Sequence, residues 1–352
     1  MTVGVQARAP RRRTTSTGVR RRGGVGVAAF AATVGVLVLM VLLSLSVGSN
    51  PIPLGRAWTL LLHPDHSQES IVLRDLRVPR TVVGLVVGAA LGLSGALMQS
   101  LTRNPLADPG ILGVNAGAGF AVVLAVAAFG VTGIWFYLWF AFAGAAIASV
   151  GVYLLGGTGR QHATPVRLAL AGVAISAALG ALTQTVILAN QEAFNEFRFW
   201  VTGSLEGRRW AVLAATGPFI AVGAVMALLL GRALNALALG DETGRALGVK
   251  VRRTRALAMV ANTLLCGAAT AAVGPIAFVG LAVPFTARAL VGSDQRWVAV
   301  FCLLLGPTWL LAADVLARVV VSPQEVAAGI VAAIVGAPVF VAIVRRRRIE
   351  AL

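Results

Sequence analysis

TVVGLVVGAALGLSGALMQSLTRNPLADPGILGVNAGAG, residues 81–119, is the stretch that decides the fold of this chain. Residues 81–101 are apolar and long enough to cross a bilayer, since a membrane-spanning helix needs about 20 such residues. Pro105 and Pro109 end that helix, and either Asp108 or the residues around Asn115 can cap the next one. The glycines of the closing GVNAGAG allow helices to approach one another closely. The stretch therefore predicts two membrane helices joined by a tight turn, which is either a plain connection or the rim of a pathway.

The composition of the 352-residue chain favours lipid over water as its surroundings. Hydrophobic residues make up 58% of it and charged residues 12%, whereas soluble domains average about 25% charged residues. The formal net charge is +17, and every basic residue except Lys250 is arginine. These charges stand at the ends of apolar runs rather than along one polar face, which argues against nucleic-acid binding. They are typical of membrane topology signals, so we predict an all-α membrane protein.

The apolar runs predict a bundle of ten membrane-spanning helices. The first run is longer than the core of a signal peptide and no clear cleavage site follows it, so we expect an uncleaved helix. Only Gly274 and Pro275 separate the seventh span from the eighth, which makes nine the main alternative count. The predicted spans are residues 28–47, 81–101, 111–129, 136–155, 168–190, 212–232, 256–273, 275–292, 297–317 and 326–344.

The distribution of arginine predicts the orientation of these spans, because short cytoplasmic loops carry an excess of basic residues. It places both termini in the cytoplasm, with residues 1–27 as a disordered Arg-rich tail, 28–344 as the transmembrane domain and 345–352 as a second tail. The arginines left outside either anchor the protein at the membrane surface or bind acidic residues of an extracytoplasmic partner. They are Arg56, Arg74, Arg77, Arg80, Arg198, Arg208, Arg209 and Arg318.

The charged residues near the spans indicate whether the chain could use an ion gradient or bind ATP itself. No predicted span has an acidic residue at its centre, which counts against an ion-coupled carrier. Asp314 comes closest, and Arg318 lies one helical turn away, so these two predict an ion pair. Lys250 is followed by valine rather than serine or threonine, so the chain has no P-loop for ATP. The cysteines and histidines lack the spacing of metal ligands, and we predict no catalytic residue, metal site or bound cofactor.

The sequence ALGDETGRALGVKVRRTR, residues 238–255, forms the longest predicted cytoplasmic loop. It predicts a short amphipathic helix that starts near Asp241 and ends before Gly248. Such a helix presents Leu247 and Val249 beside charged residues. It is suited to docking a soluble partner, although a simple basic linker explains the same residues. The later sequence GPIAFVGLAVPFTARALVG, residues 274–292, predicts a broken or bent helix because it holds two prolines and several glycines.

Residues 76–119 resemble the signature of the iron–siderophore, haem and cobalamin permeases, the membrane subunits of binding-protein-dependent ABC importers. Further motifs of that family follow in the expected order, at residues 238–249, 274–292, 312–320 and 325–344. The resemblance implies a type II ABC importer permease fold with ten helices in a cell membrane. It also implies a second permease subunit, two ATPase subunits that bind ATP and Mg²⁺, and an extracytoplasmic binding protein. A ferric siderophore is the expected cargo, with haem or cobalamin as the alternative.

The same resemblance implies roles for individual residues where the motifs match. The residues expected to dock the binding protein are Arg77, Arg80 and Arg318. Those expected to couple to the ATPase are Leu239, Gly240, Asp241, Glu242, Gly244, Leu247 and Gly248. Those expected to form a cytoplasmic gate are Asn104, Leu106, Thr164 and Pro165. Apart from the resemblance, two polar residues of the fifth span, Gln184 and Asn190, are expected to line the pathway.

Overall fold

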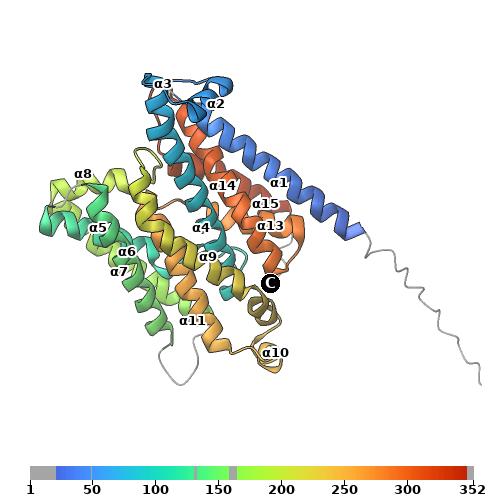
Figure 1. Cartoon of the computed structure of the whole chain (residues 1–352). Coiled ribbons are helices and arrows are strands. Elements are labelled where there is room, and N and C mark those ends of the chain that lie inside the picture. The colour runs from blue at the N-terminus through green and yellow to red at the C-terminus, as the bar shows by residue number, and fades with distance from the viewer. Residues whose placement is uncertain (1–20, 49, 131–132, 158–164, 347–352) are drawn as a thin grey trace, which may run out of the picture.

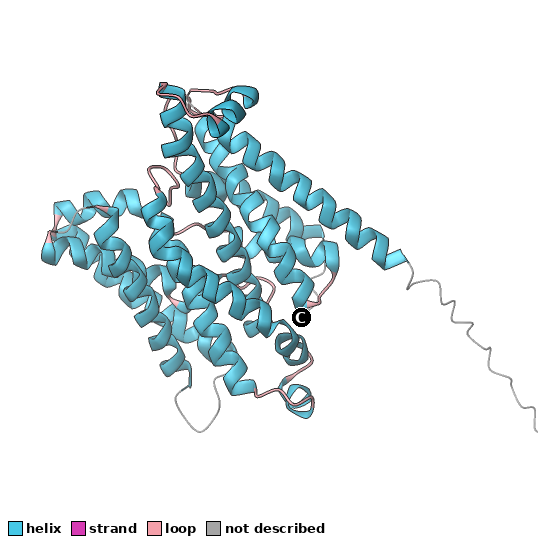
Figure 2. Cartoon of the chain, in the orientation of Figure 1, coloured by secondary structure: helices cyan, strands magenta, loops and turns pink. Residues whose placement is uncertain are grey.

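The computed structural model describes residues 21–48, 50–130, 133–157 and 165–346, and all regular structure in these ranges is helical (Figure 2). Most of the two predicted tails lies outside these ranges. The α-helices are α1 (Arg21–Ser46), α2 (Leu54–Leu62), α3 (Gln68–Ile71), α4 (Val78–Thr102), α5 (Val114–Phe129), α6 (Ile134–Gly157), α7 (Pro165–Ala189), α8 (Gln191–Trp200), α9 (Trp210–Ala238), α10 (Asp241–Ala246), α11 (Val251–Asn262), α12 (Ala268–Val273), α13 (Val279–Val291), α14 (Gln295–Val319) and α15 (Ala328–Arg346). The π-helical turns η1 (Val72–Arg77) and η3 (Thr263–Gly267) and the 3-10 turn η2 (Pro109–Leu112) complete the chain.

Every predicted span contains a helix, although the helices differ in length. Seven helical segments within the described ranges are long and apolar enough to cross a membrane. Three shorter apolar segments, in α5, α13 and α15, coincide with the remaining predicted spans. The number of membrane crossings therefore stays a prediction. The helices α2, α3 and α8 were not predicted, because each is short and its residues do not form a long apolar run.

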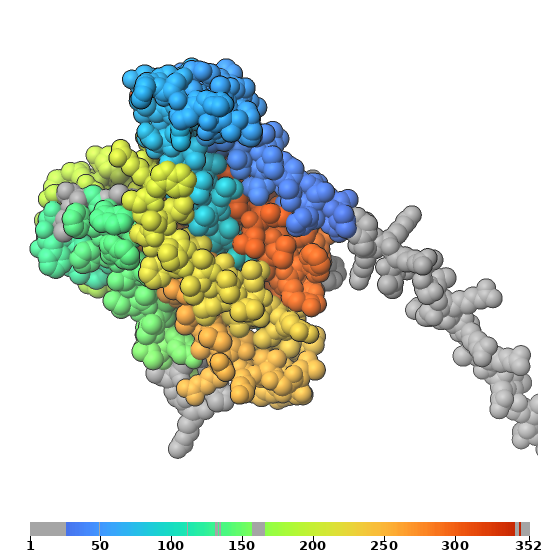
Figure 3. Space-filling view, in the orientation of Figure 1, coloured from blue at the N-terminus to red at the C-terminus, as the bar shows by residue number. Residues whose placement is uncertain are grey.

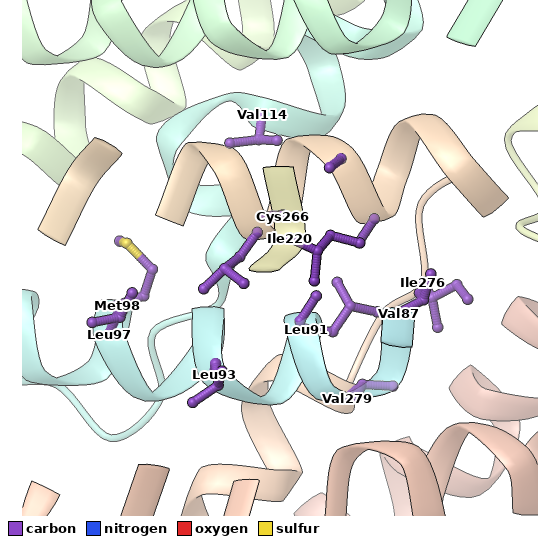
Figure 4. Packing of buried hydrophobic residues seen from close by; sticks show 14 of the residues in the cluster. Val87, Leu91, Leu93, Leu97, Met98, Val114, Ile220, Cys266, Ile276 and Val279 are labelled. Carbon is purple, nitrogen blue, oxygen red and sulfur yellow. The ribbon is translucent and has the colours of Figure 1, made fainter. Parts of the chain in front are cut away.

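Helix α4 forms the centre of the molecule. The most apolar 18-residue stretch of the continuous helical segment Gln68–Thr102, which ends with α4, is 78% buried, compared with 6% for α1 and 17% for α7. Side chains of α4 meet those of η3, α9 and α13 in a dry core (Figure 4). The side chains of α1 and α7 are therefore largely exposed in the single chain. The core side chains drawn from α4 are Val87, Leu91, Leu93, Leu97 and Met98.

Glycines set the closest approaches between helices in this core. A Cβ atom on Gly88 of α4 would lie 2.6 Å from the Cα atom of Pro307 in α14. A Cβ on Gly95 would overlap the backbone of Gly280 in α13. Small residues let helix backbones pack directly on one another, which supplies van der Waals contact where lipid removes the hydrophobic driving force.

The two ends of the helical bundle carry different short helices (Figure 1). The short helices α2 and α3 lie at one end, where they form a cap over the ends of α1 and α4 (Figures 1 and 3). Helix α10 lies at the opposite end, beside the ends of α9 and α11. The predicted break after residue 273 is present: α12 ends at Val273, Phe278 has a left-handed φ of 67°, and α13 begins at Val279. Residues 274–278, from Gly274 to Phe278, connect the two helices.

Candidate functional site

The polar turn of the opening stretch is compact and held by its own side chains. Arg103 ends α4 with a left-handed φ of 50°. The amide of Leu106 donates to the side-chain oxygen of Asn104 at 2.9 Å, and the amide of Gly110 donates to Asp108 at 2.8 Å. Asp108 therefore caps the short turn η2, whereas the next long helix, α5, begins after Gly113 with no side-chain cap. Asn104 is exposed and Leu106 is half-buried, so the turn presents these two predicted gate residues at the edge of the bundle.

The predicted loop helix is present as α10, Asp241–Ala246. Gly240 precedes it with a φ of 112° and Gly248 follows it with a φ of 83°, so glycines set both of its ends. Gly244 is buried, and a Cβ there would lie 3.0 Å from a methyl group of Leu237. Leu239 and Leu247 are 67% and 61% exposed. Apolar side chains that stand in water beside charged ones are suited to binding another protein.

An ion-pair cluster joins the polar turn to α10. Asp241 Oδ1 accepts a hydrogen bond from Arg103 at the end of α4 and a second from Arg255 of α11, the latter at 2.9 Å. The two motifs that the sequence places more than a hundred residues apart are thus in direct contact. Sequence reasoning placed both on the cytoplasmic side but did not pair them.

A second ionic cluster lies near the opposite end, around Asp314 of α14. Arg80 donates to Asp314 from Nε at 3.1 Å and from Nη2 at 2.7 Å, and from Nη1 to Glu325 at 2.6 Å. Arg318 donates to the other oxygen of Asp314, which confirms the predicted ion pair. Asp314 and Arg318 are buried, Arg80 is almost buried, and Glu325 is the most exposed member of the cluster. Sequence reasoning missed Glu325, because nothing in its spacing links it to Arg80.

Arg77, the third arginine predicted for docking, holds the last turn of α1. Arg77 is buried and donates to the carbonyl oxygens of Leu45 and Ser46, each at 2.9 Å, and to that of Asn50. Arg318 donates to the carbonyl oxygen of Ser44 at 2.8 Å. Guanidinium groups at a helix C-terminus satisfy carbonyls that have no intrahelical partner. The three arginines predicted for docking are thus neighbours with partners inside the chain, and their docking role stays a prediction.

Buried polar side chains also cross the core of the bundle. Ser94 of α4 donates to Asn262 at 2.6 Å, and Gln99 donates to the carbonyl oxygen of Leu281 at 3.2 Å. Arg288 of α13 donates to Gln99. These contacts join α4 to α11 and α13 where the sequence showed only apolar runs with scattered polar residues. They fix the register of the helices, since each buried polar group needs its partner.

The other predicted site residues are spread along the chain. Gln184 is exposed on α7. Asn190 accepts a hydrogen bond from the amide of Ala193 at 2.9 Å and thereby caps α8. Pro165 begins α7, and Thr164 lies outside the described residues. No group of three metal-ligating side chains occurs among the residues that the structure covers.

Two charged groups in loops have shifted pKa values. Asp294 precedes α14, and the hydrogen bonds from Arg296 and Asn235 hold the pKa of its carboxyl below the ordinary value. Burial lowers the pKa of the Arg208 guanidinium, in the loop before α9, to about 10. Both groups therefore remain charged at neutral pH and reinforce the polarity of the loops.

Comparison with known proteins agrees with this arrangement. The FecCD transport family matches residues 36–346. The chain is 46% identical to the ferric enterobactin transport system permease protein FepD of Escherichia coli strain K12, over 92% of this chain and 98% of that protein. It is 41% identical to the probable siderophore transport system permease protein YfiZ of Bacillus subtilis strain 168, over 80% of this chain and 84% of that protein. The structure resembles that of an inward-facing metal-chelate type ABC transporter, with a TM-score of 0.81, 27% identity, and coverage of 91% of this chain and 100% of that one. The chain therefore belongs to the FecCD transport family and is a permease of ABC importers, a transport subunit rather than an enzyme.

Proposed function

We propose that this chain imports a ferric siderophore across the cell membrane by alternating access, driven by a partner ATPase. The observation that carries the proposal is the identity to a ferric enterobactin permease along almost the whole chain. The relative from Bacillus subtilis is also named for siderophore transport. The chain itself contributes the pathway and its gates, while ATP and Mg²⁺ are bound by the ATPase subunits.

The proposed assembly contains two permease subunits, two ATPase subunits and an extracytoplasmic binding protein. Exposed Leu239 and Leu247 around α10 support the ATPase contact, because they form an apolar surface beside charges. The little-buried faces of α1 and α7 leave surface for a second permease subunit and for lipid. The second subunit is either a copy of this chain or a related chain.

The proposed topology has ten crossings and both termini in the cytoplasm. The arrangement of the two ends supports it, because the basic residues around α10 lie opposite the cap formed by α2 and α3 (Figure 1). In this topology the polar turn of residues 103–113 lies at the cytoplasmic mouth, where Asn104 and Leu106 serve as gate residues. The clustered arginines Arg77, Arg80 and Arg318 lie toward the outside.

Among these arginines, Arg80 is the best placed to meet a binding protein. Its Nη1 atom pairs with Glu325, whose side chain is partly exposed, whereas Arg77 and Arg318 bind backbone carbonyls of the first helix. An acidic residue of a docking protein would therefore reach Arg80 before the other two. Arg77 supports docking indirectly, by holding the end of α1.

The cargo is tested by uptake of radiolabelled ferric siderophore, haem and cobalamin in cells with and without this gene at matched iron status. We expect loss of ferric siderophore uptake alone, since the two relatives compared here are named for siderophores. Expression of the gene from a plasmid should restore it. If uptake of haem or cobalamin is lost instead, the ferric siderophore is the wrong cargo and the compound whose uptake is lost is the cargo. Unchanged uptake of all three, in a strain lacking related permeases, would contradict it.

A further inference from the structure

The contact between Asp241 and Arg103 connects the helix that faces the ATPase to the helix at the centre of the core. Asp241 is the first residue of α10, and Arg103 ends α4. A single oxygen of Asp241 accepts from Arg103 and from Arg255 of α11. One carboxylate thus binds three helices at the point where the proposed ATPase contact begins.

The environment of this cluster makes the contact more than a surface ion pair. The side chains of Arg103 and Asp241 are about one-third exposed and that of Arg255 is nearly buried. Partly buried, charge-assisted hydrogen bonds are stronger than fully solvated ones. Two arginines share one carboxylate, so neutralising Asp241 leaves two positive charges facing each other at close range. The cluster therefore depends on Asp241 more than on either arginine.

Helix α10 packs mainly on the end of α9, with Gly244 against Leu237, and also contacts α11. Both α9 and α11 pack on α4. The side chain of Arg103 adds a direct ionic contact between α10 and the end of α4, at the first residue of the polar turn. Beyond Arg103 the turn carries the predicted gate residues Asn104 and Leu106, so a displacement of Asp241 acts on the backbone next to them.

We propose that Asp241 is a positioning residue that transmits the movement of α10 to the cytoplasmic turn after α4. This inference rests on the proposed function, because it takes α10 to be moved by the ATPase. As α10 shifts, Asp241 draws Arg103 and the end of α4 with it, and the turn opens or closes. Arg255 keeps the carboxylate aligned with α11 during the movement.

The experiment measures transport and ATP hydrolysis together in the complete complex reconstituted in proteoliposomes. The variants are Asp241→Asn, Arg103→Gln and the double variant, with Asp241→Glu as the conservative change. We expect each single variant to lower the amount of cargo moved per ATP by about tenfold, the order expected for loss of one charge-assisted hydrogen bond. ATPase binding and the rate of hydrolysis should stay near wild type in Arg103→Gln, because Arg103 lies outside the segment expected to contact the ATPase. Asp241→Glu should recover most of the transport.

The double variant separates this role from general damage to the fold. If both residues act through one contact, the double variant should be no worse than Asp241→Asn alone, because the two effects are then not additive. Arg252→Gln is the matched control: it removes an exposed arginine of α11, and we expect no change in cargo per ATP. If Asp241→Asn fails to assemble, Arg103→Gln measures the same contact from its other side.

Three results would overturn the proposal. They are unchanged cargo per ATP in both single variants, additive losses in the double variant, and loss of ATPase binding by Asp241→Asn with normal coupling in Arg103→Gln. In each case wild-type transport continues, so the proposed function stands while the inference falls. Absence of ATP-dependent transport by the wild-type complex would instead overturn the proposed function and the inference with it.

Discussion

Replacing Asp314 with asparagine is expected to destabilise the permease by about 3–5 kcal/mol, the range for removing one partner of a buried ionic cluster. Asp314 is fully buried and accepts hydrogen bonds from both Arg80 and Arg318. Asparagine keeps the shape but leaves two guanidinium groups with Glu325 as the one remaining acid in the cluster. The loss should appear as a lower midpoint of thermal unfolding for purified protein in detergent.

The control for this prediction is Asp65→Asn, which breaks an ion pair with Arg56 that is exposed to solvent. We expect no measurable change in its unfolding midpoint, because exposed pairs are screened by water. Both variants remove one negative charge, so a difference between their unfolding midpoints reports the effect of burying the ion pair. A midpoint for Asp314→Asn equal to that of wild type would show that the cluster does not hold these ends of α1, α4 and α14 together.

Replacing Gly95 with alanine is the second large effect that we expect. A Cβ at this position overlaps the carbonyl group of Gly280, which is backbone and cannot move aside as a side chain can. Helices α4 and α13 must separate, and overpacking of this kind costs about 1–3 kcal/mol for a modest shift and more when backbone is displaced. We expect a strongly lowered unfolding midpoint and reduced yield of monodisperse protein in size-exclusion chromatography.

Gly35→Ala in α1 is the matched control for the glycine prediction. No atom outside the neighbouring backbone lies within 4 Å of a Cβ at this position. Alanine also favours a helix over glycine by about 1 kcal/mol, so the variant should be as stable as wild type or slightly more so. Equal stability of Gly95→Ala and Gly35→Ala would mean that α4 and α13 do not meet as closely as the structure places them.

The sequence was sufficient for features that depend on neighbouring residues. The helix α10 was predicted within its observed bounds, because glycines flank a short charged segment and set its ends. The pair of Asp314 and Arg318 was predicted from their spacing of one helical turn. In each case the interacting groups are separated by only a few bonds along a helix or turn.

The features that the sequence did not predict are contacts between distant segments. Arg80 and Asp314 are 234 residues apart, and Arg103 and Asp241 are 138 residues apart. Nothing in local spacing selects these partners from the other charges at the same end. The arginines at this end were expected either to anchor the protein at the membrane surface or to bind a partner, because burial cannot be seen in the sequence. In the structure Arg77 and Arg318 also bind the last carbonyls of α1, a contact that was not predicted.

The most direct test of the account uses the purified complex in proteoliposomes with radiolabelled ferric siderophore and its binding protein. We predict uptake only when the binding protein is present on the outer side and Mg²⁺-ATP is available on the side of α10. A non-hydrolysable ATP analogue should abolish net uptake, and a collapsed proton or sodium gradient should leave it unchanged. Uptake that follows an ion gradient and proceeds without ATP would contradict the account.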